Sequence, residues 1–341
     1  MSRIRIAVDA AGGDHGPRDI VSGALIAARH LGFGLTLVGP AQLIDEERRR
    51  HDEFEGVDVL VVPTPDVIAM GEGPGALRRK PKASVCVAAE TVAEGAAAAF
   101  FSAGNTGATL MAAHVVFGML PGVERPALAT RIPSRHRDAV LLDVGATVDC
   151  RAEHLLQFAV MGTLYAKTIL SIDTPRVGLL SIGEEEIKGN DLTRDAYRLL
   201  LESELCFTGN LEARELYSGA ADVIVCDGFT GNVALKVSEG LVEMVEDLLR
   251  DELSRTFTTQ LGYLLSRRSF RRFRRRVDYS EYGGAPILGV DGLAMVGHGC
   301  SSVKAVRNAL ALTYRLVQEK LVTTIGQGMP ILATEQRRQI Q

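Results

Sequence analysis

The chain lacks the cysteine spacing of a disulfide framework or a zinc site. Its five cysteines are scattered and form no C-x-x-C motif: Cys86, Cys150, Cys206, Cys226 and Cys300. Such spacing is typical of reduced thiols in a cytosolic protein. We therefore expect a cytoplasmic protein with no disulfide framework and no metal site.

A strong excess of one charge is also absent. The 341 residues carry a formal net charge of −4, so the whole chain has no general attraction to nucleic acid, and we expect no nucleic-acid partner. Charged residues make up 23% and hydrophobic residues 46% of the chain, which predicts an ordered protein with a large core.

We also expect neither a signal peptide nor a membrane span. Arg3 and Arg5 precede only a few apolar residues before Asp9 interrupts them. Residues 95–123 carry no formal charge, but a polar G-N-T-G loop at 104–107 would be costly in hydrocarbon. This stretch is better interpreted as a buried strand, a loop and a buried helix.

Three common catalytic signatures do not occur: G-x-x-x-x-G-K-[ST], G-x-S-x-G and H-E-x-x-H. P-loop chemistry, a hydrolase nucleophile elbow and a zinc-binding helix are therefore not expected. Residues 297–302, G-H-G-C-S-S, resemble a dinucleotide fingerprint, but no strand-end acid follows to hold a ribose. An anion-binding loop fits this stretch equally well, and we expect no nicotinamide cofactor.

Apolar runs alternate with helical patterns along the chain. Strands are predicted at residues 3–9, 34–40, 57–63, 97–103, 139–145, 176–183, 223–225 and within 292–302, with a link or short strand at 126–133. The alternation predicts an α/β fold: a three-layer αβα Rossmann-like sandwich with a largely parallel sheet.

Polar residues follow six of these strands. Parallel strands end at one edge of a sheet, so we expect their exits to converge on one site. The exits carry Asp9, Asp14 and His15; Ser102, Asn105 and Thr106; Asp143 and Gly145; Glu184, Glu185, Glu186 and Lys188; Asp227, Thr230 and Asn232; and His298 and Ser301.

Residues 221–236, ADVIVCDGFTGNVALK, predict a buried strand, a turn and a helix start. Backbone N–H groups and the helix dipole at such a turn favour an anion, phosphate above all, although a simple tight connection explains the glycines too. Phosphate attacks an acyl carbonyl without a strong base, and a thiolate leaves with little help because a thiol pKa is about 8.5. Catalysis would then rest on positioning and oxyanion stabilisation.

Seven ordered stretches resemble the bacterial phosphate acyltransferases of phospholipid synthesis, the PlsX family. They read IAVDAAGGDHGP, FFSAGNTGATLMAA, LLDVGATVDC, RVGLLSIGEEEIKGN, GAADVIVCDGFTGNVALK, DYSEYGGAPILGVDG and GHGCSSVKA. Together they span nearly the whole chain. The departures from the family pattern are Ala11, Thr147, Ser181 and Cys300, and Thr147 weakens any requirement for an amide at its loop.

The resemblance implies acyl transfer from acyl-ACP to inorganic phosphate, giving acyl phosphate and free acyl carrier protein. It implies a fold akin to phosphotransacetylases and isocitrate-type dehydrogenases, a homodimer, and no metal or redox cofactor. It also implies peripheral contact with the inner face of the membrane and a downstream glycerol-3-phosphate acyltransferase. Alternatives are a phosphotransacetylase-like enzyme using acyl-CoA, a non-catalytic scaffold for lipid-synthesis enzymes, and a dehydrogenase.

With this resemblance, Lys188 and Asn232 are the expected catalytic residues. Lys188 would orient phosphate or steady the carbonyl oxygen, unless it is a surface lysine paired with Glu185 or Glu186. Asn232 would donate to phosphate or the oxyanion. Other expected phosphate or substrate contacts, each with a capping or loop-linking alternative, are Asp14, His15, Asn105, Thr106, Thr230, Gly231, His298 and Ser301.

Residues 1–325 are expected to form one α/β domain, with an inserted helical hairpin at 240–278 and a loose polar tail at 326–341. Leucines and a phenylalanine recur every four residues up to Leu265, and Gly262 is the predicted hairpin turn. Expected contacts with acyl carrier protein or the membrane are Leu261, Leu265, Arg267, Arg268, Arg271 and Arg272. A dimer-interface helix with a solvated basic end is the alternative.

Overall fold

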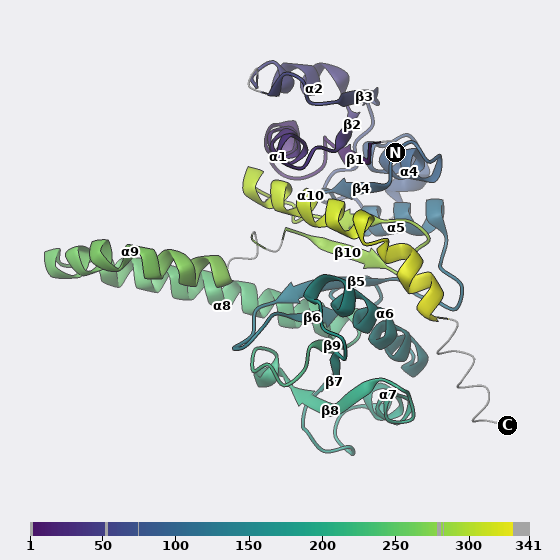
Figure 1. Cartoon of the computed structure of the whole chain (residues 1–341), viewed down its shortest axis with the longest axis vertical. Coiled ribbons are helices and arrows are strands. Elements are labelled where there is room, and N and C mark those ends of the chain that lie inside the picture. Colours follow the sequence, from purple (N-terminus) through teal and green to yellow (C-terminus); the bar gives the residue numbers. More distant parts are fainter. Residues whose placement is uncertain (1–2, 52–53, 74, 278–280, 282, 330–341) are drawn as a thin grey trace.

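The computed structural model describes residues 3–51, 54–73, 75–277, 281 and 283–329. Within these residues, strands form one 11-stranded sheet in the order β3-β2-β1-β4-β11-β10-β5-β6-β9-β7-β8 (Figure 1). The strands are β1 Arg5–Asp9, β2 Gly34–Gly39, β3 Val59–Pro63, β4 Ala99–Ser102, β5 Ala127–Ile132, β6 Ala139–Leu142, β7 Arg176–Ser181, β8 Cys206–Glu212, β9 Val223–Val225, β10 Ala285–Leu288 and β11 Ala294–Val296.

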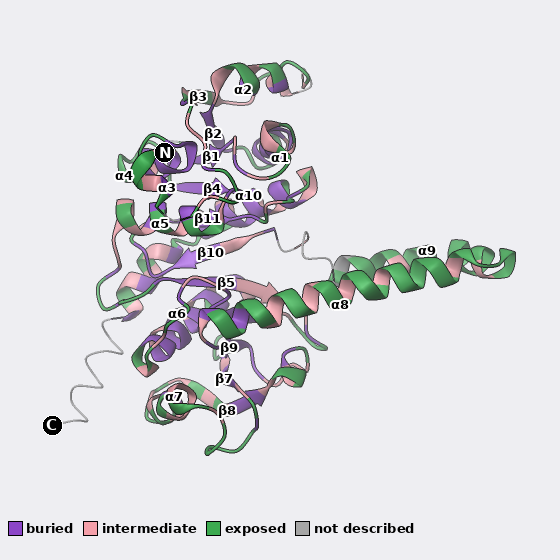
Figure 2. Cartoon of the chain, turned by 180° about the vertical axis from the view of Figure 1, so that it is seen from behind, coloured by how far each residue is buried: buried purple, intermediate pink, exposed green. Residues whose placement is uncertain are grey.

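Helices cover both faces of this sheet. One face carries α1 Gly16–Leu31, α2 Ala41–Arg48, α6 Ala152–Leu170, α7 Asp191–Leu201 and α10 Val303–Gln318, and the other carries α3 Ala76–Arg79, α4 Ser84–Ala93, α5 Thr106–Phe117 and the start of α8. Each interface has its own buried apolar cluster (Figure 2). The predicted three-layer αβα sandwich with a largely parallel sheet is confirmed.

The direction of the strands reverses in the middle of the sheet. β10 pairs antiparallel with β11 and with β5, and β5 pairs antiparallel with β6. The strands β1, β2, β3, β4 and β11 therefore run opposite to β6, β7, β8 and β9. The expectation that all six polar exits share one edge is wrong, because this reversal places them in two groups at opposite edges.

The sequence prediction missed two strands. β10 contains Pro286, which has no N–H for a ladder, yet it lies in the middle of the sheet. β8 is an edge strand with alternating exposed residues and Gly209 at φ +99°. Residues 126–133, predicted as a link or short strand, contain β5.

The hairpin is present, but its turn is not at Gly262. Helix α8 runs over Gly228–Ser254 and α9 over Phe257–Val277, so the chain turns at Arg255 and Thr256. The Thr256 hydroxyl accepts from the Thr259 N–H at 3.2 Å, an N-cap that starts α9. Gly262 lies inside α9. Both helices project away from the body as one arm (Figures 1 and 2).

The C-terminal prediction also needs correction. Residues 321–329 are helical, and Met329 is buried against the body, so residues 326–329 are not loose. The remainder of the predicted tail lies outside the described residues. No helix in the described part of the chain combines the length and apolarity needed to cross a bilayer.

Candidate active site

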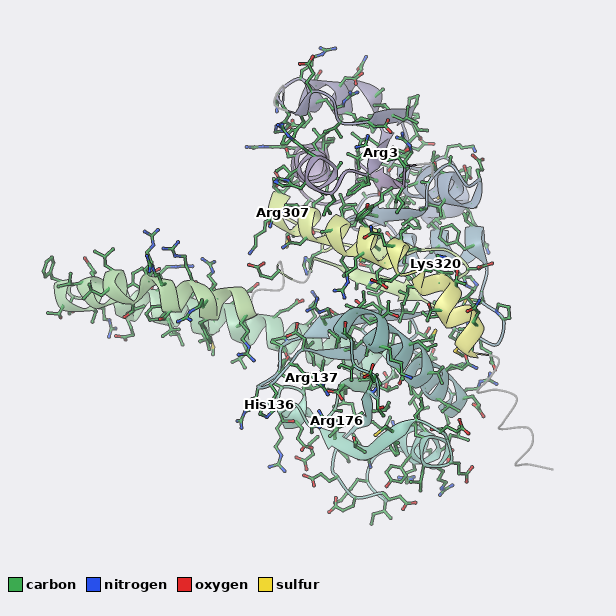
Figure 3. The ribbon with its side chains drawn as sticks, in the orientation of Figure 1. Arg3, His136, Arg137, Arg176, Arg307 and Lys320 are labelled. Carbon is green, nitrogen blue, oxygen red and sulfur yellow. The ribbon has the colours of Figure 1, made fainter. Side chains whose placement is uncertain are left out.

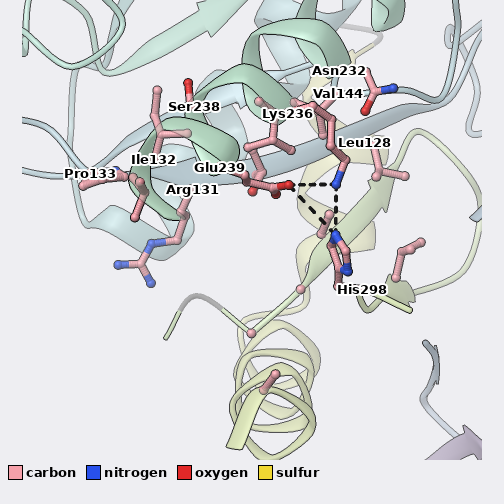
Figure 4. A pocket seen from close by; sticks show the side chains of 18 of the residues that line it. Leu128, Arg131, Ile132, Pro133, Val144, Asn232, Lys236, Ser238, Glu239 and His298 are labelled. Carbon is pink, nitrogen blue, oxygen red and sulfur yellow. Dashed lines mark hydrogen bonds and ion pairs between the residues drawn. The ribbon is translucent and has the colours of Figure 1, made fainter. Parts of the chain in front are cut away.

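A cavity of about 900 Å³ lies between α8, β5 and the loop that follows β11 (Figure 4). Its apolar lining includes Leu128, Ile132, Val144, Leu235, Leu241 and Val296. Its polar lining includes Thr106, Asn232, Lys236, Glu239, His298 and Ser301. The cavity therefore brings together residues from both groups of strand exits, because α8 starts at the exit of β9 and runs back across the sheet.

The start of α8 is fixed by capping and close packing. Asp227 is the N-cap, and its carboxylate accepts from the Thr230 backbone N–H at 2.8 Å and the Thr230 hydroxyl at 2.7 Å. Gly231 is buried against the backbone of Asp143, where a Cβ would lie 1.9 Å from the carbonyl oxygen. Thr230 and Gly231, both predicted site residues, thus position the start of α8, and Asn232 is the next residue.

Asn232 and Lys236 lie one helical turn apart and both line the cavity. The Lys236 ammonium donates to the Glu239 carboxylate at 2.8 Å and to His298 Nε2 at 2.9 Å (Figure 4). His298 Nδ1 lies 3.0 Å from the Cys300 thiol. Sequence reasoning missed Lys236 and Glu239, although the four-residue spacing from Asn232 was a usable signal.

The loop after β6 forms the floor beside Asn232. The buried Asp143 carboxylate accepts backbone N–H bonds from Leu128, Gly145, Ala146 and Thr147 at 2.6–3.1 Å. Burial nevertheless raises the pKa of Asp143 to about 6. A Cβ on Gly145 would lie 3.7 Å from the Asn232 amide carbon, so this loop sits directly against that amide.

The exits of β1, β4 and β11 form a second cluster. The buried Asp9 carboxylate accepts from the Ser102 hydroxyl at 2.7 Å, and burial raises the pKa of Asp9. The Asp14 backbone N–H donates to the Gly299 carbonyl at 2.8 Å, which links the loops after β1 and β11. The Asp14 and His15 side chains are exposed.

Asn105 has a capping and loop-fixing role in this cluster. Its side-chain oxygen accepts from the Ala108 N–H at 2.9 Å, so it caps α5. Its amide donates to the carbonyls of Met70 and Glu72 at 2.7 and 3.0 Å. Both amide protons are therefore committed within the protein, whereas Thr106, the first residue of α5, lines the cavity.

Lys188 and Ser301 occupy different settings. Lys188 lies on the exposed loop after β7, outside the described lining of the cavity. Because β7 runs parallel to β9, this loop lies at the same edge as the turn before Asn232. No carboxylate among the described residues lies within ion-pair distance of the Lys188 ammonium. Ser301 is buried and donates to the His298 carbonyl at 2.5 Å.

The predicted contact residues on the hairpin are all exposed along α9: Leu261, Leu265, Arg267, Arg268, Arg271 and Arg272. Nitrogen-tipped side chains project from this arm in Figure 3. At its base, Arg276 donates to the Ser134 carbonyl at 2.6 Å, and Arg274 pairs with Glu246 of α8 at 3.2 Å. The arm is thus anchored at its base and solvated beyond it.

Two observations limit the chemistry near the cavity. Burial raises the pKa of the Cys150 thiol to about 12 and that of Cys226 well above its ordinary range, so neither thiol is a ready nucleophile. Within the described ranges, no group of three His, Cys, Asp or Glu side chains is placed to hold a metal ion. What the site offers is an amide, an ammonium, a helix N-terminus and an apolar wall.

The chain is similar to known proteins over most of its length. The model of the family described as "Fatty acid synthesis protein" matches residues 4–324. A phosphate acyltransferase of Nitratidesulfovibrio vulgaris is 48% identical over 331 residues, 96% of each chain. One from Geotalea uraniireducens is 45% identical over 317 residues, 93% of this chain and 91% of its own.

Solved structures show the same fold at low identity. A phosphotransacetylase from Streptococcus pyogenes superposes with a TM-score of 0.63 at 16% identity, covering 93% of this chain and 94% of its own. A branched-chain phosphotransacylase from Enterococcus faecalis gives a TM-score of 0.56 at 13% identity, covering 92% and 99%. The predicted likeness to phosphotransacetylases is confirmed, and the chain belongs to the fatty acid synthesis protein family.

Proposed function

We propose that this protein is a phosphate acyltransferase that moves a fatty acyl group from acyl-ACP to inorganic phosphate. The observation that carries the proposal is the cavity, in which an apolar wall meets Asn232 at the first turn of α8. The names of the relatives support the reaction class, since those aligned over 91–96% of their length are phosphate acyltransferases.

The apolar lining suits a fatty acyl chain. Leu128, Ile132, Val144 and Leu241 offer aliphatic contacts along a cavity of about 900 Å³. Each methylene moved from water into such a wall gains about 0.8 kcal/mol. A long chain would therefore bind more tightly than an acetyl group, and its thioester end would lie at the polar wall.

The polar wall supplies what phosphate attack requires. A phosphate oxygen attacks the thioester carbonyl carbon, the tetrahedral intermediate collapses, the C–S bond breaks, and the thiolate takes a proton from water. Asn232 donates to the developing oxyanion, aided by the dipole of α8. Lys188, on the neighbouring exit loop, is proposed as a second group that orients the phosphate.

The hairpin is the proposed contact with partners. Acyl carrier protein and bacterial membranes are both acidic, and α9 exposes Arg267, Arg268, Arg271 and Arg272 beside Leu261 and Leu265. Each basic residue near an anionic surface contributes about 1 kcal/mol. We propose that this arm makes peripheral membrane contact at the inner face and supports a homodimer that passes acyl phosphate to a glycerol-3-phosphate acyltransferase.

A second candidate is acyl-CoA as the acyl donor, which the likeness to phosphotransacetylase structures favours. Incubation of the full-length protein with a long-chain acyl-ACP and phosphate, with hydroxylamine as trap, separates the two. We expect phosphate-dependent acyl hydroxamate with acyl-ACP. Product from acyl-CoA alone would support the second candidate, and no product from either donor would leave a scaffold role.

A further inference from the structure

We propose that the Lys236 ammonium is the cation that binds the phosphate substrate in the cavity. This assignment rests on the proposed function, and it adds a binding residue that the sequence reasoning did not single out.

An ammonium has three N–H donors. In Lys236, one points to Glu239 at 2.8 Å and one to His298 Nε2 at 2.9 Å, from two different segments of the chain. Figure 4 draws both interactions, which together restrict the flexible side chain. Among the described residues, no acceptor for the third N–H is present, and the side chain lines the cavity.

Three arginines line the cavity: Arg131 and Arg276 are engaged elsewhere, and Arg135 is exposed. Arg131 pairs with Asp138 at 2.5 Å, and its guanidinium points away from Lys236 in Figure 4. Arg276 donates to the backbone carbonyl of Ser134 at 2.6 Å. Lys236 is the one lysine in the described lining, and it lies at the end that holds Asn232 and His298.

Two further donors complete an oxyanion environment. Asn232 lies one turn before Lys236 on the same face of α8. Thr106 opens α5 at the cavity wall, where the first N–H groups of a helix have no intrahelical acceptor. Lys236 and Glu239 form an ion pair whose opposite charges offset each other, so a phosphate would be held by hydrogen bonds from the third N–H of the ammonium, the Asn232 amide and the N-terminus of α5.

The test measures phosphate dependence in wild-type protein, Lys236→Met, Lys236→Gln and Lys236→Arg. Lys167→Met is the matched control, since Lys167 is exposed on α6 on the opposite face of the sheet. We expect Lys236→Met and Lys236→Gln to raise the KM for phosphate about tenfold or more, with the KM for acyl-ACP changed less than about twofold. Lys236→Arg should recover part of the loss, and Lys167→Met should match wild type.

Direct calorimetric titration with inorganic phosphate, without any acyl donor, gives an independent readout. Wild type should bind and Lys236→Met should bind at least about tenfold more weakly. An unchanged phosphate KM and affinity in both neutral variants would overturn the assignment while leaving the proposed function intact. If wild type binds phosphate through Lys236 but forms no acyl phosphate, the proposed function fails and this assignment stands.

Discussion

Gly231 of α8 packs against the backbone of Asp143 so closely that a Cβ would lie 1.9 Å from the Asp143 carbonyl oxygen. The contact fixes the start of α8 against the loop after β6. Since the obstructing atom is backbone, the helix itself would have to move. Gly231→Ala should therefore destabilise the protein by about 3 kcal/mol or more, measured by urea unfolding.

Gly240→Ala is the matched control on the same helix. A Cβ at Gly240 would meet nothing within 4 Å, and alanine is the better helix former by up to about 1 kcal/mol. This variant should be as stable as wild type or more stable. Equal stabilities for the two glycine variants would contradict the packing described at Gly231.

Asp143 should make stability depend on pH. Burial raises its folded-state pKa to about 6 from 3.8, so its contribution is present below about pH 4 and is lost as pH rises through about 6. Asp143→Asn does not titrate and loses an acceptor of backbone N–H groups. It should be less stable than wild type at about pH 5, and the difference in unfolding free energy between the two proteins should narrow by about 1.4 kcal/mol by about pH 7.5.

The pKa of Asp222 is shifted in the opposite direction to that of Asp143. Burial opposes its ionisation, but hydrogen bonds from Arg176 and Arg137 outweigh that effect and lower the pKa of Asp222. Figure 3 labels these two arginines in the second half of the sheet. Because the contribution of Asp222 is lost as pH falls, the gap between Asp222→Asn and wild type should widen as pH rises through the acid range. If the stability difference from wild type changed with pH in the same direction for Asp143→Asn and Asp222→Asn, the opposite pKa shifts of these two carboxyls would be refuted.

Asn105→Ala should lower the free energy of unfolding by more than the loss of an ordinary helix cap does. It removes the cap on α5 and two bonds to the carbonyls of Met70 and Glu72. We expect a loss of about 2 kcal/mol or more, together with faster proteolysis in residues 64–82. Asn190→Ala is the comparison, because among the described residues the Asn190 side chain bonds only to Thr193 at the exposed start of α7, and its loss should lower the unfolding free energy by about 1 kcal/mol. If both variants lost the same unfolding free energy and were cleaved equally fast, the loop within residues 64–82 would be held by contacts other than those of Asn105.

Replacing Leu261 and Leu265 by glutamate should reduce sedimentation with anionic liposomes several-fold. Both side chains are exposed on the projecting arm, and the change removes apolar area and adds negative charge next to the arginines. Leu201→Glu, at an exposed leucine of α7, should leave sedimentation unchanged. If the two proteins sediment alike, the arm is not the membrane contact.

Local chemistry made much of the fold predictable. At residues 223–232, β-branched residues form β9, Asp227 caps α8, and glycines permit the close turn. All of these signals lie within a few residues of one another. The helix that carries Asn232 was therefore predicted, together with the polar turn before it.

The rest depends on contacts between distant segments. The reversal of strand direction arises from β10, whose Pro286 argues against a central strand, and from its pairing with β5. The bond between Lys236 and His298 joins residues 62 positions apart. Neither the pairing of β10 with β5 nor the contact between Lys236 and His298 could be predicted from spacing, although the four-residue spacing from Asn232 does place Lys236 on the same face of α8.

The most direct test of phosphate attack is product analysis with phosphate labelled with ¹⁸O at all of its oxygens. Full-length protein, long-chain acyl-ACP and labelled phosphate would be mixed, and the acyl product identified by mass spectrometry. Phosphate attack on the thioester predicts an acyl phosphate that carries every label, with free acyl carrier protein formed in equal amount. Unlabelled fatty acid as the main product, or acyl carrier protein released at the same rate without phosphate, would contradict it.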